Sequence, residues 1–297
     1  MRAAAIFGLG SSTHDLKPFQ VGTKTEWVIG LPASSAGLDA ILVFGGDGTV
    51  HRHLGALVRL GLPVLVVPAG SGNDFARALG LHRVRDSLAA WRTFASGGAN
   101  VGTTDLGLIT PLSSAGEASA PSGASHYFSC AAGVGLDGEI ARRANALPRW
   151  LRRHGGYALS LPGALLRFRP FRLKLRTSQG MGDTEFFPRS EQPVVAAVFA
   201  NTPVYGGGMR IAPRARMDDG QLDVCLIGDI SKLKLVGVFP TVYFGRHLGI
   251  REVEYFTANR ARVETERPLD VYADGEYVCH TPFEAGVAPG ALRVVVL

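Results

Sequence analysis

Two glycine-rich turns, each placed directly after a short apolar run, limit the folds open to this chain. The run 40–44 ("AILVF") leads into "GGDGT" (45–49), and 62–68 ("LPVLVVP") leads into "AGSGN" (69–73). An unbroken apolar run of this length is typical of a strand covered on both faces, as in a parallel sheet. Apolar residues with helical spacing follow each turn. Strand, turn and helix in this order predict an α/β lobe, in which a mostly parallel sheet has helices on both sides.

The chain changes in texture after Asp105. Residues 111–125 are low in complexity, and we interpret them as an extended hairpin loop. Beyond them, short β-like runs alternate with turn residues about every 8–12 residues, which is typical of an antiparallel sandwich or partial barrel. We therefore predict an α/β lobe over residues 1–107 and a mainly antiparallel β-sandwich lobe over residues 108–297. The last strand is free to pack back on the first lobe.

Composition excludes several classes of protein. The chain has 297 residues, 46% of them hydrophobic and 19% charged, which is enough apolar material for globular lobes. Its net charge of +6 favours anionic partners, but the basic residues form no long runs, so we expect no nucleic acid. No stretch reaches the roughly 18–20 apolar residues that span a bilayer. Any membrane contact is therefore expected to be peripheral.

Cysteine usage indicates a reducing compartment. Cys130, Cys225 and Cys279 lie far apart, and none has the spacing of a zinc ligand pair. The N-terminal stretch is too short and too weakly apolar for a signal peptide. We expect a cytoplasmic protein without disulfide bonds.

Asp47 stands in the middle of the first glycine turn, where its charge would repel a phosphate. Glycines at a strand-to-helix turn let a phosphate approach the backbone N–H groups of the helix N-terminus. Because Mg²⁺ takes oxygen ligands from carboxylate and phosphate alike, Asp47 fits such a site if the phosphate arrives with the ion. Thr49 would add a hydroxyl. The turn is neither a P-loop nor a dinucleotide fingerprint. The alternative is that Asp47 is only the N-cap of a helix opened by Val50.

The second glycine turn strengthens the ligand-binding interpretation. Turns that leave neighbouring parallel strands face each other across one crevice at the carboxyl edge of the sheet, where open α/β sheets bind ligands. Ser71 and Asn73 would supply neutral hydrogen bonds there. The alternative is that Asn73 or Asp74 simply caps the helix that follows.

The two turns, in this order, resemble the diacylglycerol kinase catalytic domain, which sphingosine kinases and bacterial soluble lipid kinases share. Further segments fit the family in residues and spacing. They are "TDLG" around Asp105, "AAGVGLDGEIA" (131–141), "NTPVYGGGMRIAPRARMDDGQLDV" (201–224) and "DGE" (274–276). "GGDGT" alone is shared with NAD kinases and phosphofructokinases, so the combination, which runs from about Leu38 to the C-terminus, carries the resemblance.

The resemblance implies an ATP-dependent lipid kinase. Its nucleotide lobe would be like that of NAD kinases and diacylglycerol kinases, its β-sandwich lobe would take the lipid, and the active site would lie in the cleft between them. Position by position, Asp274 looks like the general base, with Asp105 and Glu276 in its carboxylate and Mg²⁺–water network. The residues implied for ATP and its metal ion are Gly45, Gly46, Asp47, Gly48, Thr49, Gly70, Ser71, Gly72 and Asn73.

Ordinary structural roles compete with two of these assignments. Asp274 begins an Asp-Gly turn, which is common in hairpins. Asp218 and Asp219 resemble the segment that holds a structural Mg²⁺ in the bacterial branch of the family, and a solvated turn is the alternative for both residues.

The N-terminus departs from the family. The family usually opens with a strand, an Asn-Pro-x-Ser-Gly loop and a full helix. Here residues 8–20 ("GLGSSTHDLKPFQ") contain no Asn-Pro and leave too little room for that helix. Gly8, Gly10, Ser11 and Ser12 are still able to form a phosphate-binding turn.

Two apolar segments bear on the lipid. Residues 149–175 mix Trp, Phe and Leu with Arg and Lys, and we predict that they contact an anionic membrane surface. The alternative is an amphipathic helix followed by an edge strand. The apolar stretch from Leu233 to Leu248 is assigned to the core, with a kink or break at Pro240.

Three functions stay open at this point. The first is phosphorylation of a lipid hydroxyl, on diacylglycerol, a related glycerolipid or a sphingoid base. The second is a kinase of a soluble acceptor such as NAD. The third is a catalytically weak nucleotide- or lipid-binding protein. A homodimer is left open as well.

Overall fold

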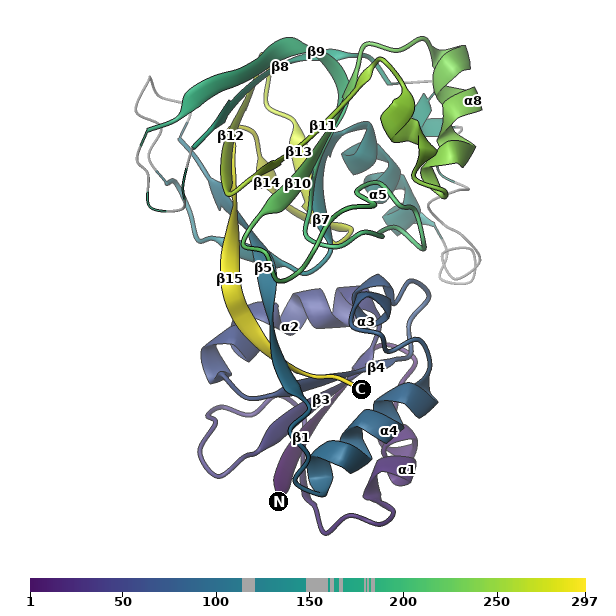
Figure 1. Cartoon of the computed structure of the whole chain (residues 1–297), viewed down its shortest axis with the longest axis vertical. Coiled ribbons are helices and arrows are strands. Elements are labelled where there is room, and N and C mark those ends of the chain that lie inside the picture. The colour runs from purple at the N-terminus through teal and green to yellow at the C-terminus, as the bar shows by residue number, and fades with distance from the viewer. Residues whose placement is uncertain are drawn as a thin grey trace.

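The computed structural model describes residues 1–113, 121–147, 160, 163–165, 168–178, 180, 182 and 185–297. They form two lobes stacked along the long axis of the molecule, joined by two long strands (Figure 1). These strands are β5 (Val101–Pro111) and β15 (Phe283–Val295), which pair antiparallel along almost their whole length. Near its end β15 also pairs with the N-terminal sheet, where Val294 lies opposite Val64. A two-stranded ribbon therefore holds the lobes together.

The N-terminal lobe is an α/β layer structure. Its sheet runs β15-β4-β3-β1-β2, and all of its neighbours are parallel. The strands are β1 (Arg2–Phe7), β2 (Glu26–Ile29), β3 (Ala40–Gly45) and β4 (Val64–Pro68). The helices are η1 (Thr13–Leu16), α1 (Lys17–Gln20), α2 (Asp47–Leu60), α3 (Asp74–Ala78) and α4 (Val84–Ala95). The strands predicted at 40–44 and 62–68 are confirmed, and the four-residue α1 agrees with the prediction that residues 8–20 leave too little room for a full helix.

Helix α2 shows why the helices form where they do. Val50, Leu54 and Leu57 recur at helical spacing and are buried against the sheet. The helix begins after Gly46 and ends at Gly61, whose φ of +65° is the left-handed conformation that favours glycine. It therefore begins at Asp47, three residues before Val50, and places the glycine turn directly on its N-terminus.

The C-terminal lobe is built from antiparallel strands. The sheet order is β14-β13-β7-β9-β8-β12-β15, with β10 attached to β9, β11 to β10 and β6 to β5. The bounds are β6 (His126–Phe128), β7 (Ala131–Gly135), β8 (Phe171–Thr177), β9 (Phe187–Ala200), β10 (Leu222–Gly228), β11 (Val253–Ala258), β12 (Arg260–Thr265), β13 (Asp270–Ala273) and β14 (Glu276–His280). The mixed sheet, parallel in the first lobe and antiparallel in the second, confirms the predicted fold class.

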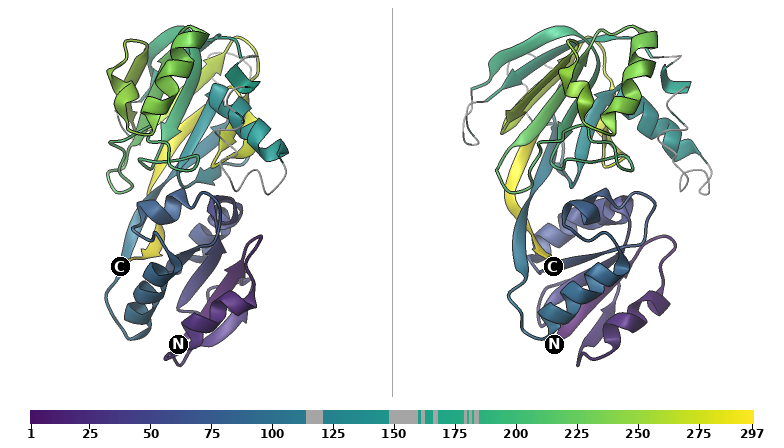
Figure 2. Two further views of the ribbon diagram at one scale, coloured as in Figure 1. Left: turned by 90° about the vertical axis from the view of Figure 1, so that its right-hand side faces the viewer. Right: turned by 45° about the vertical axis from the view of Figure 1, so that its right-hand side comes forward.

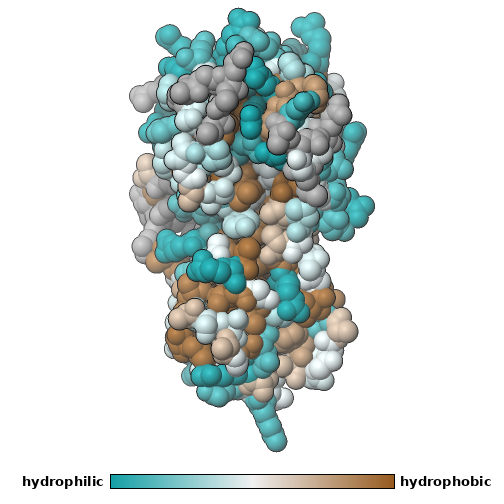
Figure 3. All heavy atoms as spheres, turned by 90° about the vertical axis from the view of Figure 1, so that its left-hand side faces the viewer, coloured by the Kyte–Doolittle hydropathy of each residue, from teal (hydrophilic) through white to brown (hydrophobic). Residues whose placement is uncertain are grey.

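Helices cover one side of the C-terminal lobe. They are α5 (Leu136–Ala146), α8 (Lys232–Val242) and η2 (Arg246–Gly249). Figure 2 shows α5 and α8 on the same side, and their buried apolar side chains share one cluster. Figure 3 shows the opposite side, where hydrophilic residues dominate the C-terminal lobe and apolar residues gather at the waist and over the N-terminal lobe. No helix in the described part of the chain has the length and apolar character needed to cross a bilayer.

The assignment of the Leu233–Leu248 stretch to the core is wrong in part. Leu235 and Val242 are buried, but Leu233 is 88% exposed and Phe244 is 71% exposed. The stretch is apolar on all sides, so its spacing could not indicate which face packs on the lobe. As expected of an internal proline, Pro240 lies just before a break, because α8 ends at Val242 and the chain resumes as η2.

Most of the predicted membrane segment 149–175 lies outside the described residues. Its described end, β8, alternates buried apolar residues with exposed Arg172 and Lys174. Because β8 pairs with β9 on one side and β12 on the other, the alternative of an edge strand is wrong. The ends of the 111–125 hairpin are paired, since Leu112 bridges to Pro121.

Candidate active site

The two glycine turns touch each other backbone to backbone. A Cβ added to Gly46 would lie 2.8 Å from the Cα of Gly70. Strands β3 and β4 bring the turns together, because Gly45 pairs with Pro68 at the carboxyl ends of both strands. The prediction that the turns meet at this edge of the sheet is confirmed. Only glycine fits at the point of contact.

Asp47 links the two turns through its carboxylate. Its oxygens accept hydrogen bonds from the backbone N–H groups of Asp74 and Phe75, both at 3.1 Å. Asp47 therefore caps α3, and the N-cap position of its own helix belongs to Gly46. A Cβ on Gly72 would lie 2.5 Å from the Asp47 carboxylate. Burial, followed by the charge of Asp74, raises the pKa of Asp47 to about 6.

The other polar residues of the second turn have different roles from those expected. Asn73 has a φ of +55° and its amide makes two hydrogen bonds of 2.8 Å with the backbone of Gly70, so it closes the turn instead of capping α3. Ser71 is exposed. The buried carboxylate of Asp74 accepts a hydrogen bond from Gly207 N at 2.7 Å and pairs with Arg77. Asn73 holds the N-cap position of α3, as one alternative predicted, but its side chain makes no capping hydrogen bond, and the carboxylate of Asp47 caps the helix instead.

The first strand adds a third turn to this edge. Gly8 donates a hydrogen bond to Phe44 O at 2.7 Å, and a Cβ on Gly8 or Gly45 would collide with the side chain of Thr49. Ser11 N closes the turn onto Gly8 O at 3.1 Å. Within the described residues the Ser11 hydroxyl is buried and has no hydrogen-bond partner. Buried polar atoms are normally satisfied, so this hydroxyl is suited to a ligand oxygen.

Asp274 lies in the turn between β13 and β14, with a φ of +49°. Its side chain is fully buried. One carboxylate oxygen accepts from Ser129 N at 2.7 Å and Ser129 Oγ at 3.0 Å, and the other accepts from Cys130 N at 2.8 Å and Ala131 N at 3.3 Å. Burial alone would raise the pKa of Asp274, but His51 and these N–H groups outweigh it, so the pKa lies below its usual range.

His51 reaches Asp274 from the other lobe. Its Nδ1 lies 3.2 Å from Asp274 Oδ2, and its side chain is 15% exposed. Glu276 approaches the same helix, because a Cβ on Gly48 would lie 3.5 Å from Glu276 Oε1. Burial lowers the pKa of His51, but Asp274 and Glu276 outweigh it, so the pKa lies above its ordinary value. The turn 274–276 thus stands over the N-terminus of α2.

Asp105 makes its contacts elsewhere. Its carboxylate accepts hydrogen bonds from Gly220 N and Gly290 N, both at 2.7 Å, and its own N–H donates to Met217 O. Asp105 therefore ties β5 to the "MDDG" loop and to β15. Neither carboxylate oxygen is hydrogen-bonded to the group around Asp274, where the resemblance had implied a shared network.

The "MDDG" loop carries the implied structural metal residues. The Asp218 carboxylate pairs with Arg216 at 3.0 Å, which lowers the pKa of Asp218, and Asp219 accepts from Gln221 N at 3.0 Å. Over the part of the chain that the structure describes, no group of three or more His, Cys, Asp or Glu side chains is placed to hold a metal ion. A metal role for Asp218 and Asp219 stays a prediction.

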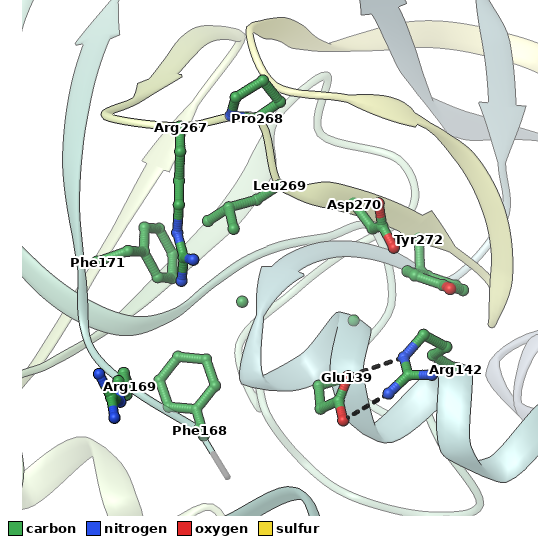
Figure 4. A pocket seen from close by; sticks show the side chains of 12 residues that line it. Glu139, Arg142, Phe168, Arg169, Phe171, Arg267, Pro268, Leu269, Asp270 and Tyr272 are labelled. Atoms are coloured by element: carbon green, nitrogen blue, oxygen red, sulfur yellow. Dashed lines mark hydrogen bonds and ion pairs between the residues drawn. The ribbon is translucent and has the colours of Figure 1, made fainter.

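A pocket of about 540 Å³ opens in the C-terminal lobe beside α5 (Figure 4). Phe168, Phe171 and Leu269 line it with apolar surface, while Glu139 and Arg142 form a hydrogen-bonded pair at its edge. The other residues labelled in Figure 4 are Arg169, Arg267, Pro268, Asp270 and Tyr272. The pocket is thus amphipathic, with apolar and charged side chains facing one space.

Asp137 is another buried carboxylate that the sequence did not single out. It lies in the first turn of α5 and accepts a hydrogen bond from the hydroxyl of Tyr205. Burial raises the pKa of Asp137 to about 6. The sequence analysis did not name three of these residues as site candidates: His51, Ser129 and Asp137. The only signal was the segment 131–141, which contains Asp137 and fits a family position.

Family models match both lobes. The model described as diacylglycerol kinase catalytic domain matches residues 21–107. The model described as YegS C-terminal NAD kinase beta sandwich-like domain matches residues 130–296, more than half of the chain. The chain belongs to the diacylglycerol kinase family of lipid kinases. It is therefore a lipid kinase, and its family implies ATP as the phosphoryl donor.

Relatives agree with this family. A diacylglycerol kinase of Mycobacterium tuberculosis (strain ATCC 25618 / H37Rv) is 35% identical over 266 residues, which cover 89% of this chain and 78% of the relative. The putative lipid kinase YtlR of Bacillus subtilis (strain 168) is 29% identical over 271 residues, covering 86% and 80%. Both names describe lipid kinases, as the resemblance implied.

Solved structures share the fold of this lipid kinase. A putative diacylglycerol kinase from Bacillus anthracis str. Sterne superimposes with a TM-score of 0.72 at 21% identity, covering 100% of this chain and 97% of that chain. An NAD kinase from Archaeoglobus fulgidus, solved in complex with ATP, gives a TM-score of 0.53 at 15% identity, covering 99% and 93%. At these identities the likeness concerns the fold alone.

Proposed function

We propose that this lipid kinase transfers the γ-phosphoryl group of ATP to a hydroxyl of diacylglycerol, in the cleft between its lobes. The observation that carries the proposal is the contact of Asp274 and Glu276 with the N-terminus of α2. It joins a carboxylate group on one lobe to a glycine cradle on the other. Phosphoryl transfer depends on such positioning of donor and acceptor and on neutralised charge.

The nucleotide end of the proposed site consists of the three turns at the edge of the parallel sheet. The turns 45–49 and 69–73 offer backbone N–H groups to phosphates, and the unpartnered Ser11 hydroxyl is a further candidate donor. Asp47 and Asp74 are neighbouring buried carboxylates whose repulsion a divalent cation would relieve. Mg²⁺ bound through Asp47 would neutralise phosphate charge, which fits this donor set.

The acceptor end of the proposed site centres on His51 and Asp274. Because the Asp274 carboxylate is fully buried and accepts five hydrogen bonds, we assign the proton acceptor to Nε2 of His51. Asp274 would hold Nδ1 as the N–H donor and stabilise the imidazolium. The lipid hydroxyl gives its proton to Nε2, its oxygen bonds to the γ-phosphorus, and the bond from that phosphorus to the β–γ bridging oxygen breaks to release ADP. Asp274 thus acts through His51.

Diacylglycerol is the acceptor that the observations support best. Relatives named diacylglycerol kinase cover most of the chain. The pocket of Figure 4 is lined by Asp270 and Tyr272 of β13, and Asp274 directly follows this strand, whose four residues span about 13 Å. An acyl chain spans such a distance. We therefore assign an apolar part of the lipid to Phe168, Phe171 and Leu269.

An acceptor competition experiment tests this function. Purified protein is given Mg²⁺ and ATP with mixed micelles of diacylglycerol, with micelles of sphingosine, or with NAD, and ADP release is followed. We expect release with diacylglycerol that falls at least about a hundredfold in Asp274→Asn and is retained in Glu266→Gln, an exposed acidic control. Release with NAD alone would support the soluble-acceptor kinase. ATP binding without release on any acceptor would support the weak binding protein.

A further inference from the structure

The outer face of α8 is an apolar stripe exposed to solvent. Leu233 is 88% exposed and Val236 is 55% exposed, and Gly237 and Pro240 continue the same side of the helix at helical spacing. Phe244, just beyond the helix end, is 71% exposed. The inner face is apolar too, because Leu235 and Val242 are buried. A helix that is apolar on all sides is normally covered on all sides.

Basic side chains border this stripe. Lys232 and Lys234 stand at the start of α8, and Arg246 and Arg251 follow its end. All four are exposed, Arg251 at 92% of its side chain. Lys234 pairs with Glu252 at 2.7 Å, so these two charges offset each other and the positive border rests on Lys232, Arg246 and Arg251. The surface thus combines an apolar centre with a positive border.

We propose that this α8 surface docks on an anionic lipid bilayer, a role that rests on the proposed function only in that the acceptor is a membrane lipid. The apolar stripe enters the boundary between headgroups and acyl chains, and the basic border meets the headgroups. A second copy of the chain is a poorer occupant, because a two-fold contact brings the same basic residues of both copies together. The opposite side of the C-terminal lobe is largely hydrophilic (Figure 3), so the stripe is a local feature.

Docking through α8 also positions the acceptor pocket. Leu235 on the inner face of α8 packs in one apolar cluster with Leu136 and Ile140 of α5. The first turns of α5 carry Asp137 and Glu139, and Glu139 lines the pocket of Figure 4. Figure 2 shows α8 and α5 on the same side of the lobe. A bilayer held by α8 would therefore lie on the side of the lobe that carries α5, beside the pocket assigned to the lipid.

Vesicle binding tests the proposal on the full chain. Co-sedimentation is measured with vesicles of phosphatidylcholine and phosphatidylglycerol and with vesicles of phosphatidylcholine alone. The variant Leu233→Gln/Phe244→Gln removes the two most exposed apolar side chains. The matched control Val21→Gln/Ile29→Gln changes apolar side chains that are 67% and 56% exposed on the other lobe. Thermal unfolding checks that each protein is folded.

We expect the α8 variant to bind anionic vesicles at least about tenfold more weakly than the wild type and the control. Binding of the wild type should weaken with added salt and on neutral vesicles. Equal binding by the α8 variant, or no binding by the wild type, would overturn the proposal. So would a wild-type dimer, seen by sedimentation velocity, that the α8 variant converts to monomers.

The same vesicle assay on Asp274→Asn separates this proposal from the proposed function. Asp274→Asn should bind vesicles as the wild type does, because the substitution leaves α8 unchanged. Binding that depends on α8 in a wild type that releases no ADP on any acceptor would uphold the docking surface and count against the kinase. If the wild type is active on micelles but the α8 variant binds vesicles as strongly as the wild type, the kinase function is upheld and the docking surface is refuted.

Discussion

The imidazole Nδ1 of His51 lies 3.2 Å from Oδ2 of Asp274, so a helix of the N-terminal lobe and a turn of the C-terminal lobe share one hydrogen bond. The two residues are 223 positions apart in the chain. Four further hydrogen bonds, from Ser129, Cys130 and Ala131, hold the Asp274 carboxylate within its own lobe. The orientation of the imidazole therefore reports how the lobes sit relative to each other.

Replacing His51 should remove the proton acceptor while leaving the lobes folded. We expect His51→Gln to lower kcat by about 10²–10⁴-fold, the usual contribution of a positioned general base. His53→Gln, two residues along α2, is the control and should retain activity. Steady-state rates on diacylglycerol micelles check this. Full activity in His51→Gln would contradict this role and would favour Asp274 as the proton acceptor.

The pH dependence of the rate carries a separate signature. Because Asp274 and Glu276 outweigh burial and raise the pKa of His51, the imidazole should stay protonated to a pH above its ordinary 6.5. Only the neutral form accepts a proton, so kcat should rise with pH through the raised pKa. A residual rate in His51→Gln without this rising limb would support the role. An unchanged limb in that variant would contradict it.

Stability should depend on pH in the opposite direction. The raised pKa of His51 means that its contribution to the free energy of unfolding is present below pH 6.5 and is lost as pH rises through the folded-state pKa. The lowered pKa of Asp274 means that its contribution is present above pH 3.8 and is lost as pH falls through the folded-state pKa. The free energy of unfolding of the wild type should therefore exceed that of His51→Gln by the largest amount between pH 3.8 and pH 6.5. Thermal unfolding across pH measures the difference, and a constant difference would refute the ion pair.

The contact of the glycine turns predicts a steric effect. Gly70→Ala should force apart the backbones of Gly70 and Gly46, with a cost of about 1–3 kcal/mol and a loss of ATP affinity. Gly55→Ala is a matched control in α2, because nothing lies within 4 Å of its added Cβ, and it should stabilise the helix by up to about 1 kcal/mol. Urea unfolding and ATP titration distinguish the two. Equal effects of both substitutions would argue against the contact.

Asp105 should act on stability more than on chemistry. Asp105→Asn keeps one acceptor oxygen and turns an NH₂ group toward Gly220 N or Gly290 N, so one of two buried hydrogen bonds is lost. We expect about 1–3 kcal/mol less stability and a kcat within a few-fold of the wild type. Asp39→Asn, at a more exposed carboxylate that also accepts a backbone hydrogen bond, is the comparison. A collapse of kcat without loss of stability would restore Asp105 to the catalytic network.

The sequence alone predicted the fold class and the meeting of the two glycine turns, because both depend on local patterns. The buried runs 40–44 and 62–68 and the glycines after them specify parallel strands whose turns meet. His51 had no such signal, since a histidine on a helix gains meaning only from a carboxylate brought to it by the second lobe. Asp47 was expected to meet the metal ion of a nucleotide, with a cap on its own helix as the alternative. It caps α3, a partner from another turn that the local sequence could not indicate, and its metal role stays a prediction.

Two further differences have physical reasons of the same kind. Asp105 follows a strand-like pattern that a catalytic and a structural carboxylate share. Its bonds to Gly220 and Gly290 favour the structural role, and its catalytic role stays a prediction. The stretch from Leu233 to Leu248 is apolar on all sides. Its periodicity therefore could not indicate which face is buried and which is exposed. Which side of the helix is exposed depends on how it packs against the lobe, and the local sequence does not show that packing.

The most direct test of the account is the formation of phosphatidic acid from diacylglycerol by the wild type and by Asp274→Asn, with Mg²⁺ and ATP labelled at the γ-phosphate. The account predicts label in phosphatidic acid with the wild type and a loss of at least about a hundredfold in the variant. Labelled lipid at an equal rate in Asp274→Asn, or no labelled lipid with the wild type, would contradict it.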